Sequence, residues 1–213
     1  MTALHVFDMD GTLLRGTTAP IELSRRLDRL EPLADLEAGF AAARITAAEF
    51  AAEMHALWTE LSAELVAEVV SASPWIDGIA EVCGDIAGRG ERSMLITMSP
   101  DFFARHLLAF GIDVVAASRF PALPFSHALD PAGILEPADK VRLAEEQRIA
   151  HGLTTRDCVA YGDSMSDLPL FRVLENTVAV NADESLEQAA AVTYRGGDLR
   201  EAYAMARELL DRR

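Results

Sequence analysis

Basic residues are scarce in this sequence. Lys and Arg number 19 against 34 Asp and Glu, which gives the 213-residue chain a net charge of −15. A surface of that charge repels DNA, RNA and anionic membranes, so we expect neither nucleic acid nor a membrane as a partner. An acidic protein still binds an anion where a divalent cation supplies local positive charge, because a bound ion dominates the field at its site.

Cysteine is also scarce, and long apolar runs are missing. Cys83 and Cys158 lie far apart in the sequence, in neither a paired-thiol motif nor a zinc-ligand spacing, so we expect two buried thiols. No run of about 18 apolar residues occurs, and the first residues lack the basic and apolar regions of a secretory leader. Together these features predict a cytoplasmic protein.

The N-terminal third of the chain predicts one strand followed by helices. Residues 4–8 form a short β-rich run that ends at the turn signal Asp10-Gly11. Residues 18–73 have apolar positions at helical spacing and no strand signal, with Thr46 and Glu49 forming a helix capping box. Pro74 must follow the end of the last helix. We therefore expect a separate helical block with boundaries near residues 15 and 75.

Beyond Pro74, helices and strands alternate. This order predicts a parallel sheet with helices on both faces. An irregular, Pro-rich passage with hairpin-like character is expected over residues 120–137, and Asp198 is expected to cap the last helix. The predicted helices cover residues 76–87, 101–110, 140–150, 168–174 and 199–210, and the predicted strands cover residues 93–97, 114–117, 158–161, 177–180 and 192–194.

Polar residues follow three of the predicted strands, and ligands of such sheets bind beyond the carboxyl ends of the strands. Asp8 ends the first strand, Thr97 ends the second, and Asp163 and Asp167 follow the fourth. Asp8 and Asp10 are two residues apart, so both side chains face the same way in extended backbone.

Carboxylates that converge without arginine repel one another unless a hard cation lies between them. Oxygen ligands favour Mg²⁺, which completes its shell with water and phosphate oxygens. The cluster therefore predicts a magnesium site and a phosphorylated substrate. Lys140, near the start of a predicted helix, supplies a compensating positive charge.

Four segments, taken together, resemble a known motif set. FDMDGTLL, LITMSP, Lys140 and YGDSMSDLPLF stand in the order typical of the haloacid dehalogenase superfamily. The helical block after the first motif is similar to the small cap of its phosphoserine-phosphatase-like branch, subfamily IB. The resemblance implies an α/β fold: a Rossmann-like core, residues 1–14 and 76–213, with an inserted helical cap domain, residues 15–75.

The resemblance also implies roles for individual residues in a magnesium-dependent phosphomonoester phosphatase. Asp8 attacks phosphorus and becomes an aspartyl-phosphate, while Asp10 protonates the leaving alkoxide and later deprotonates water. Thr97 binds a phosphoryl oxygen and Lys140 steadies the nucleophile. The metal lies beside Asp8 and the Asp10 carbonyl, with Asp163 as a direct ligand and Asp167 reaching it through water.

Several positions bear on the substrate, expected to be a small phosphorylated metabolite. Phosphoserine phosphatases carry a glutamate nine residues after the nucleophile, where this chain has Thr17, so phosphoserine itself is disfavoured. Ser166 stands where those enzymes have an asparagine near the substrate. Ser99 shares or takes the role of Thr97, and Arg44 is a candidate for a substrate carboxylate or phosphate. The roles of five large apolar residues stay open, namely Met54, Trp58, Trp75, Phe102 and Phe103.

Other functions fit parts of the same pattern. A phosphotransferase or mutase would use the same aspartyl-phosphate and hand it to a second alcohol, and the motifs alone do not separate it from a phosphatase. A dehalogenase is disfavoured because it needs no metal-binding aspartates. A non-catalytic module that binds phosphorylated ligands or a protein is disfavoured because binding requires no nucleophile. The five histidines, which show no ligand spacing, receive no role.

Overall fold

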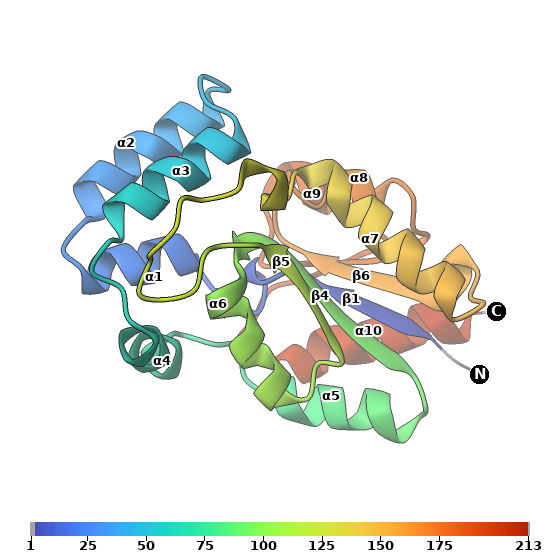
Figure 1. Cartoon of the computed structure of the whole chain (residues 1–213). Helices are drawn as coiled ribbons and strands as arrows, with labels where there is room; N and C mark the ends of the chain where they lie inside the picture. The colour runs from blue at the N-terminus through green and yellow to red at the C-terminus, as the bar shows by residue number, and fades with distance from the viewer. Residues whose placement is uncertain (1–2, 213) are drawn as a thin grey trace.

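The computed structural model describes residues 3–212, and a six-stranded parallel sheet forms the centre of the molecule (Figure 1). The strand order is β5-β4-β1-β6-β7-β8, so the first strand of the chain lies between β4 and β6. The predicted α/β fold with a parallel sheet is confirmed. The strands are β1 (Leu4–Phe7), β4 (Arg92–Pro100), β5 (Val114–Ser118), β6 (Cys158–Gly162), β7 (Asn176–Val180) and β8 (Val192–Tyr194).

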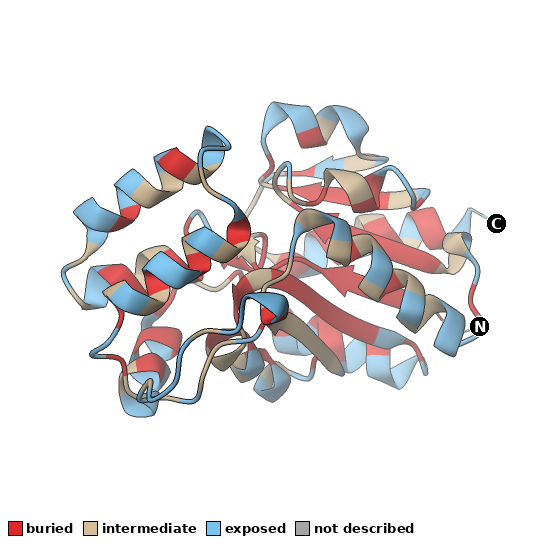
Figure 2. Cartoon of the chain, turned by 45° about the horizontal axis from the view of Figure 1, so that its top comes forward, coloured by how far each residue is buried: buried red, intermediate tan, exposed pale blue. Residues whose placement is uncertain are grey.

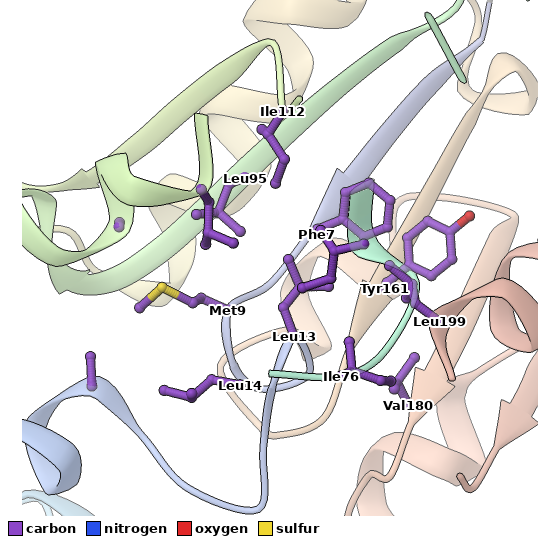
Figure 3. Packing of buried hydrophobic residues seen from close by; sticks show 14 of the residues in the cluster. Phe7, Met9, Leu13, Leu14, Ile76, Leu95, Ile112, Tyr161, Val180 and Leu199 are labelled. Carbon is purple, nitrogen blue, oxygen red and sulfur yellow. The ribbon is translucent and has the colours of Figure 1, made fainter. Parts of the chain in front are cut away.

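Alternating side chains divide the core between the two faces of the sheet. Leu4 and Val6 pack on the face covered by α7 (Pro137–Ala150), α8 (Leu168–Phe171) and α9 (Glu184–Ala189). Phe7 packs on the other face, under α5 (Ile79–Gly88) and α10 (Leu199–Asp211), where its ring stacks on Tyr161 with 4.4 Å between centroids (Figure 3). This period of two fixes which side chains reach each layer.

Four helices follow β1 and gather at the end of the sheet away from both termini (Figure 1). The capping box predicted at the third helix is confirmed: Thr46 Oγ1 accepts from Glu49 N at 3.2 Å, and Glu49 Oε2 accepts from Thr46 N at 2.8 Å. Many positions of these helices are exposed, whereas the central strands β1, β4 and β6 are largely buried (Figure 2). The helices are α1 (Ala19–Arg26), α2 (Leu30–Ala41), α3 (Ala47–Leu57) and α4 (Ala63–Ala72), here called the insert helices.

The two ends of the insert are tied together beside the sheet. Arg15 N donates to the Pro74 carbonyl at 2.9 Å, and Ile76 N donates to the Leu13 carbonyl at 2.8 Å. Leu13 and Ile76 also lie in the main core (Figure 3). Two short strands, β2 (Asp10–Gly11) and β3 (Leu14–Arg15), precede the first junction. Residues 15 and 75 as domain limits stay a prediction.

Two predicted elements differ in the structure. The expected helix over 101–110 is α6 (Asp101–Ala104) followed by a 3-10 helix, η1 (Arg105–Phe110). Within the described chain, residues 119–136 contain no strand and only the 3-10 turn η2 (Pro131–Gly133), so the hairpin-like character is wrong. Prolines lack the N–H that a hairpin ladder requires.

Several helix ends and caps are also settled. The helix expected over 168–174 ends at Phe171, and another short 3-10 turn, η3 (Thr155–Asp157), precedes β6. Asp198 caps α10 by accepting from Arg200 N at 3.0 Å, as predicted. No helix within residues 3–212 is both long and apolar enough to cross a membrane.

Candidate active site

An aspartate that follows β1 and a lysine at the start of α7 are in direct contact at the candidate site. Asp8 follows β1 and Lys140 lies in the first turn of α7, more than a hundred residues later. Lys140 Nζ donates to Asp8 Oδ1 at 2.6 Å and to Asp167 Oδ1 at 2.6 Å. All three side chains are buried. The lysine therefore bridges two carboxylates that the parallel sheet places side by side.

The loop after β6 holds Asp167 by its backbone. The amides of Asp163 and Ser164 donate to Asp167 Oδ2 at 3.1 and 3.3 Å. A Cβ at Gly162 would lie 2.5 Å from the Asp167 Cγ, so only glycine permits this approach. Both oxygens of Asp167 are thus engaged, one by Lys140 and one by the loop, which gives this side chain a fixed position.

A second glycine lets the chain turn tightly past Asp163. Gly11 has a φ of +81°, and a Cβ there would lie 1.9 Å from Asp163 Oδ2. A side chain at this position would meet both a strained backbone and a direct clash. The Asp10-Gly11 turn signal in the sequence therefore has a structural reason beyond the turn itself, which is close packing against Asp163.

Asp10 is held by donors other than the lysine. Its Oδ1 accepts from Ala19 N at 2.6 Å, in the first turn of α1, and its Oδ2 accepts from Thr97 Oγ1 at 3.1 Å. Ser99 also hydrogen-bonds this carboxylate. The insert therefore contributes to the site through a backbone amide, a contact that side-chain motifs in the sequence do not reveal.

Burial raises the pKa of the carboxylates at this edge. Desolvation, with the charge of Asp167, raises the pKa of Asp8 well above its usual value against the opposing effect of Lys140. Desolvation likewise raises the pKa of Asp10. Desolvation and the negative charge of Asp167 together raise the pKa of Asp163 to about 7. Burial lowers the pKa of Lys140, but the carboxylates of Asp167 and Asp8 more than offset this and raise it.

The described residues fit a divalent metal ion. Asp8, Asp163 and Asp167 each offer a carboxylate oxygen, and these atoms lie within 4.8 Å of one another. Asp163 Oδ1 is buried without a hydrogen-bond partner. One lysine cannot neutralise three carboxylates, and an all-oxygen donor set is typical of Mg²⁺. An acidic site suited to a metal is therefore present.

The remaining predicted residues divide into two groups. Ser166 Oγ accepts from Lys140 Nζ at 3.2 Å, and buried Ser99 donates its backbone N–H to Thr97 Oγ1 at 3.1 Å, so both adjoin the cluster. Arg44 is exposed in the turn between α2 and α3, away from it. Thr17 donates to Glu22 Oε1 at 2.6 Å. The roles of all these residues stay predictions.

An apolar cavity beside Asp10 went unrecognised in the sequence. It has a volume of about 150 Å³ and lies between α2, α3 and the carboxyl end of β4. Met54 belongs to this wall, whereas Trp58 is fully buried and donates from Nε1 to Ser24 Oγ at 2.9 Å. Alternation and helical period identify apolar residues, but not which of them face a cavity. Its lining is Asp10, Pro20, Phe40, Ala47, Phe50, Ala51, Met54, Met98, Ser99, Ile134 and Leu135.

Comparison with known proteins agrees with this arrangement. The family model of the haloacid dehalogenase-like hydrolases matches residues 5–172, which include every strand-end aspartate described above. The chain belongs to the haloacid dehalogenase-like hydrolases. The predicted superfamily is confirmed, and with it the expectation of an enzyme that catalyses a hydrolytic reaction.

Relatives of this hydrolase include members of the predicted branch. The phosphoserine phosphatase SerB1 of Mycobacterium tuberculosis (strain ATCC 25618 / H37Rv) is 28% identical over an alignment covering 94% of this chain and 71% of that protein. The structure of a substrate-bound phosphoserine phosphatase superimposes with a TM-score of 0.80 at 20% identity, covering 96% of this chain and 98% of the other.

A further structure shares the fold. It is an analogue of the phospho-aspartyl intermediate of a phosphoserine phosphatase, with a TM-score of 0.78 at 20% identity over 95% of this chain and 98% of the other. Coverage this complete includes the insert helices. The structure therefore has the fold of the phosphoserine-phosphatase-like branch, with a helical insertion after β1.

Proposed function

We propose that this hydrolase is a magnesium-dependent phosphatase that releases phosphate from a small phosphomonoester through an aspartyl-phosphate on Asp8. The observation that carries the proposal is the pairing of Asp8 with Lys140 beside a second, separately held carboxylate, Asp10. A nucleophile and a proton donor with different surroundings are what two-step phosphoryl transfer requires. The relatives named phosphoserine phosphatase support the same reaction class.

In the first step, an oxygen of Asp8 attacks the substrate phosphorus. Lys140 binds Oδ1, so we propose Oδ2 as the attacking atom. The bond between phosphorus and the ester oxygen breaks, and Asp10, whose pKa burial raises, gives its proton to the departing alkoxide. The products of this step are a free alcohol and phosphorylated Asp8.

In the second step, the ionised Asp10 takes a proton from water as the water oxygen attacks the same phosphorus. The bond between Asp8 and phosphorus breaks, inorganic phosphate leaves, and Asp10 is again protonated. Thr97 holds Asp10 in position at 3.1 Å and, together with the amide of Ser99, is our candidate for contacting a phosphoryl oxygen.

Asp8, Asp163 and Asp167 would hold the magnesium ion in this proposal. When bound, it would offset negative charge shared by the carboxylates and the phosphoryl group. Lys140 supplies fixed positive charge at the nucleophile itself. The insert helices act as a cap that excludes bulk water, with the hydrogen-bonded segments near residues 15 and 75 as its hinge.

The test is phosphate release from a panel of small phosphomonoesters with Mg²⁺, with EDTA and with Asp8→Asn. Release that requires both metal and Asp8 supports the proposal. Phosphorylation of Asp8 without release to water would instead indicate a phosphotransferase or mutase. Substrate binding with neither phosphorylation nor release would indicate a binding module and overturn the proposal.

A further inference from the structure

The cavity beside Asp10 bears on what the substrate carries beyond its phosphoryl group. Asp10 protonates the leaving oxygen in the proposed reaction, so that oxygen must lie within hydrogen-bond distance of its carboxylate. Asp10 and Ser99 belong to the wall of the cavity, and the remaining nine lining residues are apolar. The rest of the leaving group must therefore extend from Asp10 into this space.

The wall offers no partner for a charged leaving group. Within the described residues its only ionisable side chain is Asp10 itself, whose two oxygens already accept from Ala19 N and Thr97 Oγ1. An ammonium or carboxylate placed among Phe40, Phe50 and Leu135 would lose its water without gaining a hydrogen bond or a counter-ion. That loss of hydration disfavours binding of either charged group.

An acidic side chain of α1 that could bind an amino group is already engaged on another surface. Glu22 in α1 accepts from the Thr17 hydroxyl at 2.6 Å and forms an ion pair with Arg25. Both Glu22 and Arg25 line a separate hollow between α1 and α4, together with Glu68. The carboxylate therefore serves the packing of the insert and is not part of the wall beside Asp10.

We infer that this enzyme acts on phosphomonoesters of an uncharged, apolar alcohol, with a short alkyl or aryl group occupying the cavity. The inference rests on the proposed phosphatase function. An apolar cavity of about 150 Å³ holds roughly one benzene ring, which is the size of a chain of about six carbons. Burial of apolar surface then selects the substrate, and the wall rejects zwitterionic phosphoamino acids.

The experiment compares kcat/KM for ethyl, butyl and hexyl phosphate with that for O-phospho-L-serine and phosphoethanolamine. Each methylene that enters the cavity is expected to raise kcat/KM about fourfold, which places hexyl phosphate roughly 250-fold above ethyl phosphate. The two charged esters are expected to fall at least about tenfold below ethyl phosphate. A flat alkyl series, or O-phospho-L-serine as the best substrate, would overturn the inference and leave the phosphatase proposal standing.

Failure of the proposed function has a different signature. In that case no ester of the series releases phosphate and no phosphorylated Asp8 forms with any of them. The alkyl esters and the charged esters then behave alike. A preference among substrates is therefore measured only where turnover is present, and the two results are distinguishable in one set of assays.

Two substitutions change the volume of the cavity in opposite directions. Ala51→Phe places a ring into the cavity from α3 and is expected to reduce the ratio of hexyl to ethyl phosphate turnover at least tenfold. Phe50→Ala enlarges the cavity and is expected to shift the best substrate to a longer chain. Ala52→Phe is the matched control, because Ala52 is exposed on the same helix.

If Ala51→Phe fails to fold, Phe50→Ala decides, because a smaller residue at a partly buried site leaves the rest of α3 in place. An unchanged chain-length profile in a folded Ala51→Phe or Phe50→Ala variant would overturn the inference. A change of the same size in Ala52→Phe would also overturn it, since the effect would then not come from the cavity.

Discussion

Two buried polar networks lie at opposite ends of β1, and they differ in charge balance. At the carboxyl end, Lys140 is the one buried cation that contacts the aspartates in the described chain, facing Asp8 and Asp167 with Asp163 beside them. At the amino end, Glu91 pairs with Arg207 at 2.7 Å and with His5 at 3.0 Å. One end has an excess of negative charge and the other is neutralised by its own residues.

In the amino-end network, both ring nitrogens of His5 and both carboxylate oxygens of Glu91 have hydrogen-bond partners. His5 Nδ1 lies 3.0 Å from the Tyr161 hydroxyl, and its Nε2 lies 3.0 Å from Glu91 Oε2. Both carboxylate oxygens of Glu91 also accept hydrogen bonds from Arg207 Nη1, at 2.8 and 2.7 Å. His5, which its sequence position left without a role, is fully buried. We interpret this network as a structural element that joins β1 to α10.

The comparison separates two uses of buried charge. A balanced, fully hydrogen-bonded network tolerates burial, and removing one member leaves an uncompensated charge. An unbalanced cluster with an orphaned oxygen, such as Asp163 Oδ1, lowers stability unless a ligand completes it. Charge imbalance thus marks the end of β1 where binding and chemistry are expected.

The largest expected effect comes from removing the nucleophile. Asp8→Asn should reduce kcat/KM for the best phosphomonoester at least about a thousandfold, because the amide cannot form the acyl phosphate. The free energy of unfolding should change by less than about 1 kcal/mol, since one of several repelling carboxylates is lost. Steady-state kinetics and urea denaturation measure the two quantities.

Asp35→Asn is the control for that substitution, because Asp35 is exposed on α2. It should leave both quantities unchanged. A loss of stability in Asp8→Asn comparable to its loss of activity would contradict the comparison, because the cluster would then be structural.

The reverse pattern is expected at the amino end. Glu91→Ala should lower the free energy of unfolding by about 3 kcal/mol, since Arg207 and His5 lose their shared partner. The kcat/KM of the folded fraction should stay as in the wild type. Glu53→Ala, at an exposed position of α3, is the control and should change stability by less than about 0.5 kcal/mol.

Magnesium should stabilise the unbalanced end alone. At a hundred times its dissociation constant, a ligand that binds only the folded state adds about 2.7 kcal/mol. We expect a rise in the melting temperature of the wild type with Mg²⁺, reversed by EDTA, and no rise in Asp163→Asn. Calorimetric scans test this, and an equal rise in both proteins would place the ion elsewhere.

Acid should destabilise the protein through its amino end. Desolvation lowers the pKa of buried His5 in the folded state below the unfolded value of 6.5, despite its hydrogen bond to Glu91. Between the folded and the unfolded pKa, the unfolded state therefore binds one more proton than the folded state. Stability therefore falls as the pH drops below about 6.5. The charged and titratable groups around His5 are Glu91, Arg207, Arg89, Tyr161 and Tyr203.

Glu91 adds to the loss at lower pH. Burial alone would raise its pKa, but hydrogen bonds from His5 and Arg207 lower it below 4.5, so its stabilising contribution is lost as the pH falls through that folded value. Urea denaturation between pH 7.5 and 5.5 should show the His5 contribution. His5→Gln, which cannot titrate, should flatten that slope; an unchanged slope would show that another group is responsible.

Much of the fold follows from local sequence patterns. Short, largely apolar runs in β1 and β6 predict buried strands, and the Thr46–Glu49 capping box predicts the start of α3, because both signals depend on neighbours within a few residues. The change in the character of α6 after Ala104 and the irregular path of residues 119–136 depend on packing instead. Local sequence signals therefore predict the secondary structure of these two segments less well.

From the sequence alone we predict which residues carry the chemistry, because Asp8, Asp10, Thr97, Lys140 and Asp163 belong to an ordered set of motifs that local patterns make visible. Tertiary structure alone decided that Lys140 bridges Asp8 and Asp167, that Ala19 N holds Asp10, and that an apolar cavity adjoins it. These features join segments distant along the chain. Their distances depend on how the helices pack against the sheet, which no local pattern specifies.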